Sequence, residues 1–70
     1  MKNQIRELRK IKNYRQEDLA NELGVTRQTI NAIENDKYDP TLSLAFKLAH
    51  LLGTTVDELF KPDTELFTIV

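Results

Sequence analysis

The stretch from Gln16 to Asn35, QEDLANELGVTRQTINAIEN, constrains the fold more than any other part of the chain. Apolar residues recur at helical spacing on both sides of a single glycine. They are Leu19, Ala20, Leu23, Ile30 and Ile33. Gly24 can adopt a positive φ without steric cost, and Thr26 is a typical N-cap. The stretch therefore predicts two short helices that cross steeply at a tight turn, where the small Ala20 allows close approach.

The second of these helices carries a row of polar side chains opposite its apolar side. Long amide and guanidinium groups occupy this row, at Arg27, Gln28, Asn31 and Asn35. Such groups match the edges of base pairs in the major groove, where arginine suits guanine and glutamine suits adenine. The row therefore predicts a surface that reads DNA. Taken one by one, the same residues are equally ordinary on any solvent-exposed helix.

The stretch resembles the helix-turn-helix of the lambda-repressor-like family, which includes the Cro and Xre-type regulators. The residues that carry the resemblance are Gln16, Ala20, Gly24, Val25, Ile30 and Ile33. The similarity continues through RQTINAIEN and KYDPTLSLAFKLAHLLGTTVDELF, and it covers roughly residues 2 to 60. The resemblance implies an all-α fold, a compact five-helix DNA-binding domain over residues 1–61 with its helix-turn-helix at about 16–35.

The resemblance, together with the exposed loop after the motif, gives individual side chains expected roles. Contacts to bases are expected from Arg27, Gln28, Thr29 and Asn31, because the N-terminal end of this helix enters the groove first. Contacts to phosphates are expected from Gln16, Thr26, Asn35, Lys37 and Tyr38. Thr29 is also suited to a phosphate, and Tyr38 to packing on the core.

The segment before the motif predicts a first helix from about Asn3 to about Lys12. Its inward stripe is expected at Ile5, Leu8 and Ile11. In the family, an arginine at the position of Arg9 commonly pairs with the glutamate near the end of the recognition helix, here Glu34. A salt bridge between Arg9 and Glu34 is therefore expected, with two solvated charges as the alternative.

The link before the second helix departs from the family pattern. Relatives tend to place Ser or Thr directly before the glutamine, whereas this chain has Arg15, which cannot cap a helix. Asn13 and Gln16 offer a substitute capping box. Arg15 is then expected either to reach a phosphate or to remain in solvent.

Two further helices are expected after the motif. One begins after the N-cap Thr41 and ends before Gly53, and its composition is so apolar that it should be buried on most sides. Thr55 and Glu58 form a capping box for a short last helix, which is closed by Leu59 and Phe60. The single histidine, His50, falls on a narrow polar strip and is expected at the surface rather than in a metal site.

The tail at residues 62–70 lies outside the common core of the family. It is rich in apolar and strand-favouring residues, and it predicts a short C-terminal β-strand. Leu66, Phe67 and Ile69 are expected at a dimer interface, because an exposed apolar segment needs cover. The strand could pair with Met1–Gln4 or with the same tail of a second copy, and a disordered end is the alternative.

The charge distribution favours a dimer. The net charge is −1, but residues 1–38 hold eight Lys and Arg against six Asp and Glu, and residues 39–70 hold two against five. The positive excess therefore lies in the half with the helix-turn-helix. A monomer with so little positive charge should bind phosphates weakly, and two copies on one DNA site would compensate.

Composition narrows the class of protein further. The 70 residues include no cysteine, which excludes disulfides and thiolate metal sites, and no apolar run is long enough to span a bilayer. Nor do the charges of MKNQIRELRK precede the apolar segment of a signal peptide. We expect a cytoplasmic homodimer that binds double-stranded DNA as a transcriptional regulator, most simply a repressor at a palindromic operator.

Two other classes of function were compared with this one. An antitoxin-like interaction module, in which the tail binds a partner protein and DNA binding is secondary, remains the alternative. An enzyme is not expected, because the sequence has no Ser–His–Asp arrangement, metal-ligand cluster or glycine-rich phosphate loop. No catalytic residue, cofactor, metal or small-molecule ligand is therefore expected, nor any association with a membrane.

Overall fold

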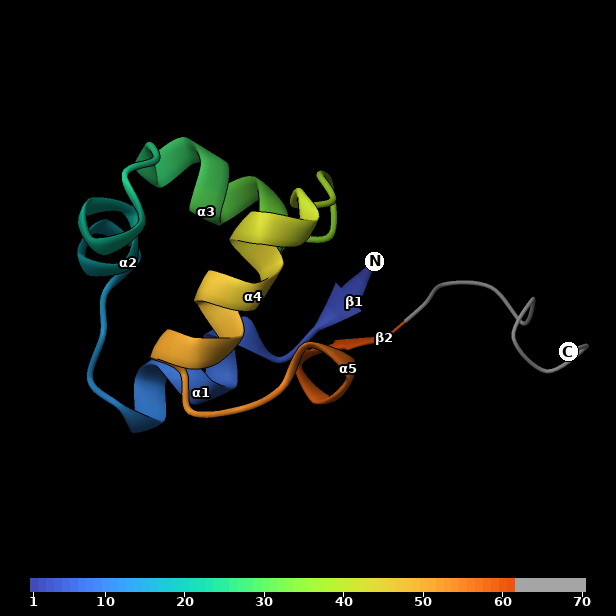
Figure 1. Ribbon diagram of the computed structural model, residues 1–70. Helices are drawn as coiled ribbons and strands as arrows, with labels where there is room; N and C mark the ends of the chain where they lie inside the picture. The colour runs from blue at the N-terminus through green and yellow to red at the C-terminus, as the bar shows by residue number, and fades with distance from the viewer. Residues whose placement is uncertain (62–70) are drawn as a thin grey trace, which may run out of the picture.

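The computed structural model describes residues 1–61. The tail at 62–70, with the dimer contacts expected of Leu66, Phe67 and Ile69, lies outside the described residues. Five helices follow one another between two short strands (Figure 1). In chain order the elements are β1 (Lys2–Asn3), α1 (Ile5–Ile11), α2 (Gln16–Leu23), α3 (Arg27–Glu34), α4 (Leu42–Leu51), α5 (Val56–Leu59) and β2 (Phe60–Lys61). The expected five-helix fold is confirmed.

The turn between α2 and α3 is built from local interactions. Gly24 adopts the left-handed conformation, with φ at 68° and ψ at 31°, and the N–H of Val25 donates to the carbonyl of Ala20 at 3.0 Å. Thr26 Oγ1 accepts the N–H of Thr29 at 3.1 Å and so caps α3. One helix thus ends and the next begins within a few residues, which fixes the angle between them.

The hydrophobic core joins all five helices. Its fully buried side chains are Ile5, Leu19, Ile30, Ile33, Leu48, Leu52 and Leu59. α4 runs through the middle of the molecule, between the α2–α3 pair and the α1–α5 end (Figure 1). Since Ile30 and Ile33 both lie in this core, the inner side of α3 is held by the rest of the domain.

The two strands form a small antiparallel sheet near the chain ends. Lys2 pairs with Lys61 and Asn3 pairs with Phe60, and the N–H of Gln4 donates to the carbonyl of Leu59 at 2.9 Å. The sequence predicted that Met1–Gln4 or a second copy would pair with a strand in the tail. The N-terminal segment does pair with a short C-terminal strand, as the first alternative predicted, and within the described residues that strand is β2, where Phe60 is buried beside β1 directly after α5.

The first helix begins later than predicted, and its buried stripe is shorter than predicted. It begins at Ile5, because Asn3 is extended in β1, where its Oδ1 accepts the N–H of Ile5 at 3.1 Å and its Nδ2 donates to the carbonyl of Ile33 at 2.8 Å. Ile5 is buried and Leu8 is half-buried, but Ile11 is 74% exposed. The expected inward stripe therefore stops at Leu8, because no neighbouring element covers the last turn of α1 within the described residues.

The start of α2 is capped in a different way from that expected. Asn13 is left-handed, with φ at 61°, and forms no capping box with Gln16. Instead, Asp18 Oδ2 accepts the N–H of Arg15 at 2.8 Å. This backbone hydrogen bond has the largest effect on the pKa of Asp18 and lowers it; desolvation opposes the shift, and the charge of the Arg15 guanidinium adds to it. The Asp18 carboxylate thus satisfies the N–H of the N-cap residue, Arg15, at the start of α2.

The later helices begin as predicted, but α4 is less covered than predicted. Thr41 Oγ1 accepts the N–H of Leu44 at 3.2 Å, and Thr55 Oγ1 accepts the N–H of Glu58 at 3.3 Å. Leu42, however, is 70% exposed and Phe46 is 59% exposed. One side of α4 therefore faces solvent with apolar residues, whereas the composition of the helix had suggested burial on most sides.

Candidate nucleic-acid interface

α3 separates its side chains into a buried side and an exposed side. Ile30, Ile33 and Glu34 point into the domain and are buried, whereas Arg27, Gln28 and Asn31 are exposed. This division follows from the helical repeat, which places residues three and four apart on one face. The exposed side is the polar row that the sequence predicted.

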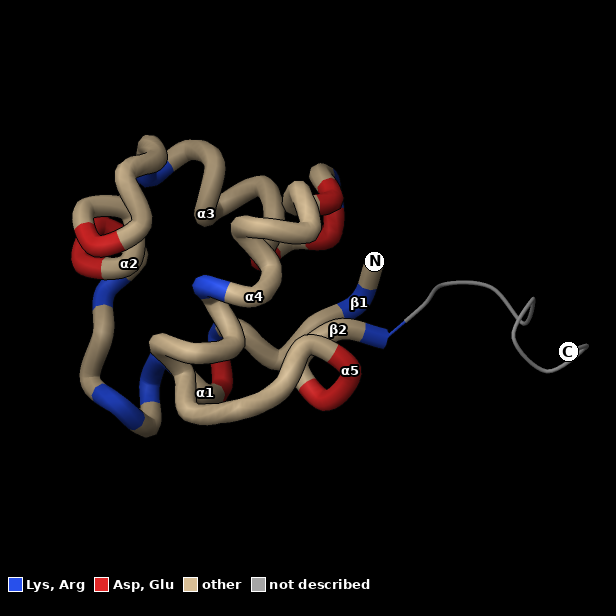
Figure 2. The backbone as a smooth tube through the Cα atoms, in the orientation of Figure 1, with Lys and Arg blue, Asp and Glu red and all other residues tan. Residues whose placement is uncertain are grey.

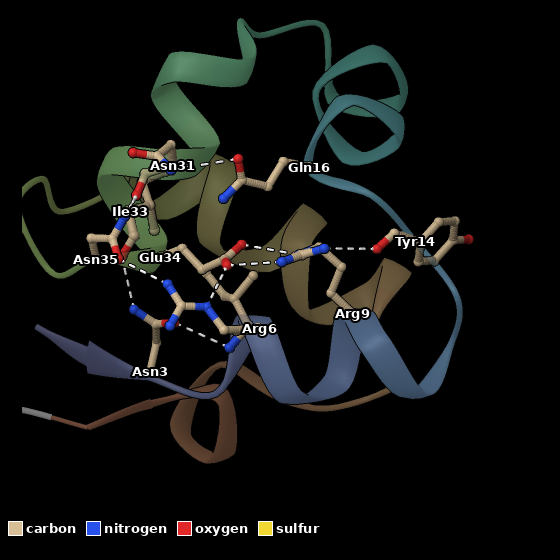
Figure 3. Close-up of polar contacts among 10 residues, drawn as sticks. Asn3, Arg6, Arg9, Tyr14, Gln16, Asn31, Ile33, Glu34 and Asn35 are labelled. Atoms are coloured by element: carbon tan, nitrogen blue, oxygen red, sulfur yellow. Dashed lines mark hydrogen bonds and ion pairs between the residues drawn. The ribbon is translucent and has the colours of Figure 1, made fainter.

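The start of α2 contributes one further side chain to this surface. Gln16 lines, together with Arg27, Gln28 and Asn31, a hollow of about 440 Å³. Asn31 Nδ2 donates to Gln16 Oε1 at 3.5 Å (Figure 3), so the two helices are linked across the hollow. Four of the expected contact residues therefore lie around one concave and mainly polar surface.

Thr29 and Thr26 lie beside this hollow rather than in it. Thr29 is half-buried, and its Oγ1 is 3.0 Å from Oγ1 of Thr26, which also accepts its N–H. Thr29 lines a different hollow with Tyr38 and Lys47. Of the four residues expected to contact bases, the structure thus groups three, and it places the fourth next to the turn.

The loop after α3 is exposed, and its conformation is stabilised by hydrogen bonds and ion pairs. Asn35, Lys37 and Tyr38 are all exposed, and the chain turns at Asp36, whose φ is 64°. The N–H of Lys37 donates to the carbonyl of Ala32 at 2.9 Å. The loop is further held by the ammonium group of Met1, which forms ion pairs with Asp36 and Asp39. The carboxylates beside Lys37 are thereby partly neutralised.

Basic side chains gather where α1, α2 and α3 approach one another. Arg9, Arg15 and Arg27 line, with Gln16 and Glu17, a second hollow of about 360 Å³. Figure 2 shows basic positions along the link from α1 to α2 and at the start of α3, with acidic positions on α2, after α3 and on α5. The positive charge therefore lies beside the polar row of α3.

A buried carboxylate fixes the C-terminal end of α3. The Glu34 side chain is 0% exposed. Its Oε2 accepts a hydrogen bond from Arg9 Nε at 3.1 Å, and its Oε1 accepts one from Arg9 Nη2 at 3.0 Å and one from Arg6 Nε at 3.0 Å (Figure 3). Arg9 also donates through Nη1 to the carbonyl of Tyr14 at 3.0 Å. Glu34 thus ties α3 to α1 and to the link before α2.

Comparison with known proteins agrees with this geometry. A family profile described as helix-turn-helix matches residues 5–59, which is most of the chain. The chain belongs to the helix-turn-helix family. It is 53% identical over 60 residues to an uncharacterized HTH-type transcriptional regulator of Methanocaldococcus jannaschii, covering 86% of this chain and 91% of that protein.

The chain is also similar to a bacterial protein and to a protein of known structure. The uncharacterized HTH-type transcriptional regulator YgzD of Bacillus subtilis is 43% identical over 60 residues, which cover 86% of this chain and 91% of that protein. The crystal structure of the hypothetical transcription factor NHTF from Neisseria matches with a TM-score of 0.72 and 30% identity, over 94% of this chain and 76% of that chain. The lambda-repressor-like resemblance of the sequence is thereby confirmed, and these relatives are named as regulators rather than enzymes.

In this helix-turn-helix chain, the expected ion pair between Arg9 and Glu34 is present, and Arg6 is a partner that the sequence analysis missed. Arg6 Nη2 donates to Asn35 Oδ1 at 2.9 Å, in addition to the bond from Nε to Glu34. Asn35 Nδ2 in turn donates to the carbonyl of Asn31 at 2.9 Å. The signal for Arg6 was its spacing, since it stands three residues before Arg9 and so shares its face of α1.

Burial and hydrogen bonding have opposite effects on the pKa of Glu34. Desolvation by burial alone would raise the pKa of Glu34, but hydrogen bonds from Arg9 and Arg6, the charge of Arg9 and a hydrogen bond from Gln16 hold the pKa below its ordinary value. The ionised form is therefore the form that stabilises the fold.

Other kinds of site find no support in residues 1–61. His50 is exposed, and no three His, Cys, Asp or Glu side chains in this part of the chain are grouped so as to hold a metal ion. Among the same residues, no helix is both long and apolar enough to cross a membrane.

Replacing Glu34 by Gln should lower the free energy of unfolding at pH 7 by about 3 kcal/mol, because the two arginines then surround a neutral amide. The pKa of Glu34 is lowered in the folded state, so its contribution is complete above the ordinary pKa of 4.5 and is lost as the pH falls through the folded-state pKa. Urea denaturation from pH 7 to pH 3 should therefore show the difference between wild type and Glu34→Gln shrinking below about pH 4.5.

The matched control is Glu22→Gln, which neutralises an exposed glutamate on α2. Its effect should stay within about 0.5 kcal/mol across the same range. A constant difference between wild type and Glu34→Gln from pH 7 to pH 3 would contradict the account of the buried carboxylate.

Proposed function

We propose that the chain is a sequence-specific regulator of transcription, which binds double-stranded DNA by inserting α3 into the major groove. The observation that carries the proposal is the hollow formed by Gln16, Arg27, Gln28 and Asn31 on the exposed side of α3. The opposite side of α3 is buried in the core and held by Glu34. In this motif, base pairs are read by the polar side of a helix whose opposite side is packed firmly against the rest of the domain.

The base-reading role falls to the residues nearest the start of α3. Arg27 and Gln28 enter the groove first, where a guanidinium can bond to O6 and N7 of guanine and an amide to N6 and N7 of adenine. Asn31 lies one turn further along α3, where its side chain would reach either a base edge or the sugar–phosphate backbone of the DNA. Thr29, beside the turn, is suited to a thymine methyl group or a phosphate.

The phosphates of the DNA backbone are proposed to bind around the exposed side of α3, which we call the reading edge. Gln16 and Thr26 flank the groove side of the helix-turn-helix, and Asn35, Lys37 and Tyr38 follow α3 in an exposed loop. These contacts would set the position of α3 on the duplex without selecting its sequence. Arg15, which lines a hollow with Arg27, is placed to add a further charge.

A homodimer on a palindromic operator is the proposed assembly. The half of the chain with α3 has only a small positive excess, so a single copy offers few phosphate contacts. Two copies would place their α3 helices in successive major grooves about 34 Å apart. Leu66, Phe67 and Ile69 of the tail remain predicted contributors to the dimer, and repression by occupying the operator is the simplest mode of action.

The test begins with selection of bound sequences from random duplexes at a stated salt concentration. On the selected site, Gln28→Ala should cost about 1–3 kcal/mol of binding free energy and relax the preference at one base pair, because one bidentate contact is lost. Titrations with the selected duplex and with duplexes altered at single positions would measure both effects.

Asn21→Ala is the matched control, since Asn21 is an exposed amide on the outer side of α2. It should change neither affinity nor preference. If even the double variant Arg27→Ala, Gln28→Ala binds the selected site as the wild type does, α3 is not the reading element.

Lys37→Ala should weaken the binding of all duplexes by a similar factor, because a phosphate contact carries no sequence information. The slope of the logarithm of the binding constant against the logarithm of salt concentration should fall by about 1. Lys10→Ala, which removes an exposed charge from α1, serves as the control. A loss of affinity confined to one sequence would contradict the phosphate role of Lys37.

A further inference from the structure

The side chain of Asn35, the C-cap residue of α3, is bonded within the protein at both ends of its amide (Figure 3). Its Oδ1 accepts a hydrogen bond from Arg6 Nη2 at 2.9 Å, and its Nδ2 donates to the carbonyl of Asn31 at 2.9 Å. An amide that is bonded through its oxygen and its nitrogen at once is held in one orientation. One N–H of Asn35 remains for a phosphate.

The carbonyl of Asn31 is held twice by the same residue. It accepts the backbone N–H of Asn35 at 3.0 Å in addition to the side-chain bond. Helices tend to fray at their ends, but here the last turn of α3 is closed by two hydrogen bonds. Asn35 therefore fixes the backbone from which the side chain of Asn31 extends, and Arg6 holds Asn35 in the orientation that does so.

Arg6 can hold Asn35 because its guanidinium is a planar fork. Nε donates to Glu34 Oε1 at 3.0 Å, while Nη2 donates to Asn35. The Glu34 side chain is 0% exposed and that of Arg6 is 50% exposed, so one prong is anchored in the domain and the other is aimed at the surface. A lysine could pair with either acceptor but lacks the fixed geometry that bonds both.

Asn31 in turn belongs to the reading edge, where its side chain contacts Gln16. Asn31 Nδ2 donates to Gln16 Oε1 at 3.5 Å, across the hollow that both residues line. Gln16 also acts on the buried carboxylate, because burial raises the pKa of Glu34 but a hydrogen bond from Gln16, like those from the two arginines, lowers it. The contacts thus form a closed ring that passes through Glu34, Arg6, Asn35, Asn31 and Gln16.

We propose that Arg6 is a positioning residue, which sets the base preference of Asn31 through Asn35. The inference rests on the proposed function, since it concerns how the reading edge is ordered. With one N–H of Asn31 engaged by Gln16, the Oδ1 and the second N–H remain for a base. This pair of an acceptor and a donor matches N6 and N7 of adenine. An amide free to rotate could turn either end toward the base, and it would discriminate less.

The first experiment measures base preference on the duplex obtained by selection. Asn31→Ala identifies the base pair that Asn31 reads, expected to be A·T, as the position at which preference is relaxed. Arg6→Lys keeps the charge but loses the fork. It should reduce the ratio of affinities for the selected duplex and for a duplex altered at that position by about three- to tenfold.

A second base pair separates positioning from a general loss of structure. At the base pair read by Gln28, Arg6→Lys should leave the ratio unchanged, because the Thr26 cap holds that end of α3. Both affinities in a ratio come from one preparation, so any loss of folded protein cancels. Lys10→Arg is the matched control, since it exchanges the same two residue types at an exposed position of α1, and it should change neither ratio.

The second experiment asks whether Arg6 acts through Asn35. Asn35→Ala removes both the acceptor of Arg6 and the side-chain bond to Asn31, so it should reduce the ratio at the base pair of Asn31 by a similar factor. Adding Arg6→Lys to Asn35→Ala should then reduce the ratio no further, because the two residues lie on one path. Independent effects would multiply instead.

The third experiment uses the free protein, without DNA. Nuclear magnetic resonance relaxation of side-chain amides measures how ordered Asn31 is before it meets a base. The order parameter of the Asn31 amide should fall in Arg6→Lys and in Asn35→Ala, and it should keep its wild-type value in Lys10→Arg.

Several results would overturn the inference. An unchanged ratio at the base pair of Asn31 in Arg6→Lys would do so, as would an equal fall at the base pair of Gln28. Multiplying effects of Arg6→Lys and Asn35→Ala would exclude the path through Asn35. A uniform loss of affinity for all duplexes, with a changed salt slope, would assign Arg6 to a phosphate. If Asn31→Ala relaxes no position, Asn31 reads no base.

These outcomes are distinguishable from failure of the proposed function. If Gln28→Ala relaxes preference at one base pair while Arg6→Lys leaves the ratio of Asn31 unchanged, the inference fails and the proposed function stands. If no duplex is selected at all, the proposed function fails, and the base preference assigned to Asn31 fails with it.

Discussion

The buried carboxylate of Glu34 is the interaction on which the position of α3 depends. A charge at 0% exposure is stable only when it is paired and hydrogen-bonded, and here Arg9 and Arg6 supply three hydrogen bonds from α1. The contact therefore does more than join two helices. Because each bond has a narrow geometry, it fixes where the C-terminal end of α3 lies relative to the rest of the domain.

The same constraint connects the core to the proposed reading edge. Ile30 and Ile33 hold the inner side of α3 without directional preference, as apolar packing does. The hydrogen bonds of Glu34 are directional and so restrict the orientation of the helix. Arg6 also donates to Asn35, and Asn35 in turn donates to the carbonyl of Asn31, so the same contacts extend to the exposed row. At the other end, the Thr26 cap fixes the first turn of α3. The exposed row between these two points is thereby held in one orientation, which reduces the ordering cost of binding.

Several features set by local chemistry could be predicted from the sequence, although the cap of α2 was not. Among contacts between distant residues, the Arg9–Glu34 pair was expected from the family resemblance, and it is present. The left-handed Gly24 and the cap at Thr26 follow from the residue types, and both are present. Ile11 has an inward spacing, but whether anything covers it depends on elements elsewhere in the chain, and it is exposed. Arg6 shares its face of α1 with Arg9, but its contact with Glu34 depends on how α3 packs against α1, which spacing within α1 alone cannot predict. A short C-terminal strand that pairs with the N-terminal segment was expected, and β2 is such a strand; its position directly after α5 was not predicted, because Phe60 was assigned to the end of the last helix.

The most direct test of the account is a crystal structure of the protein with a duplex obtained by selection. The account predicts that the side chains of Arg27 and Gln28 lie within hydrogen-bonding distance of base edges in the major groove, with Glu34 still bonded to both Arg6 and Arg9. A complex in which the exposed side of α3 faces away from the DNA, or packs against a second copy of the chain, would contradict it.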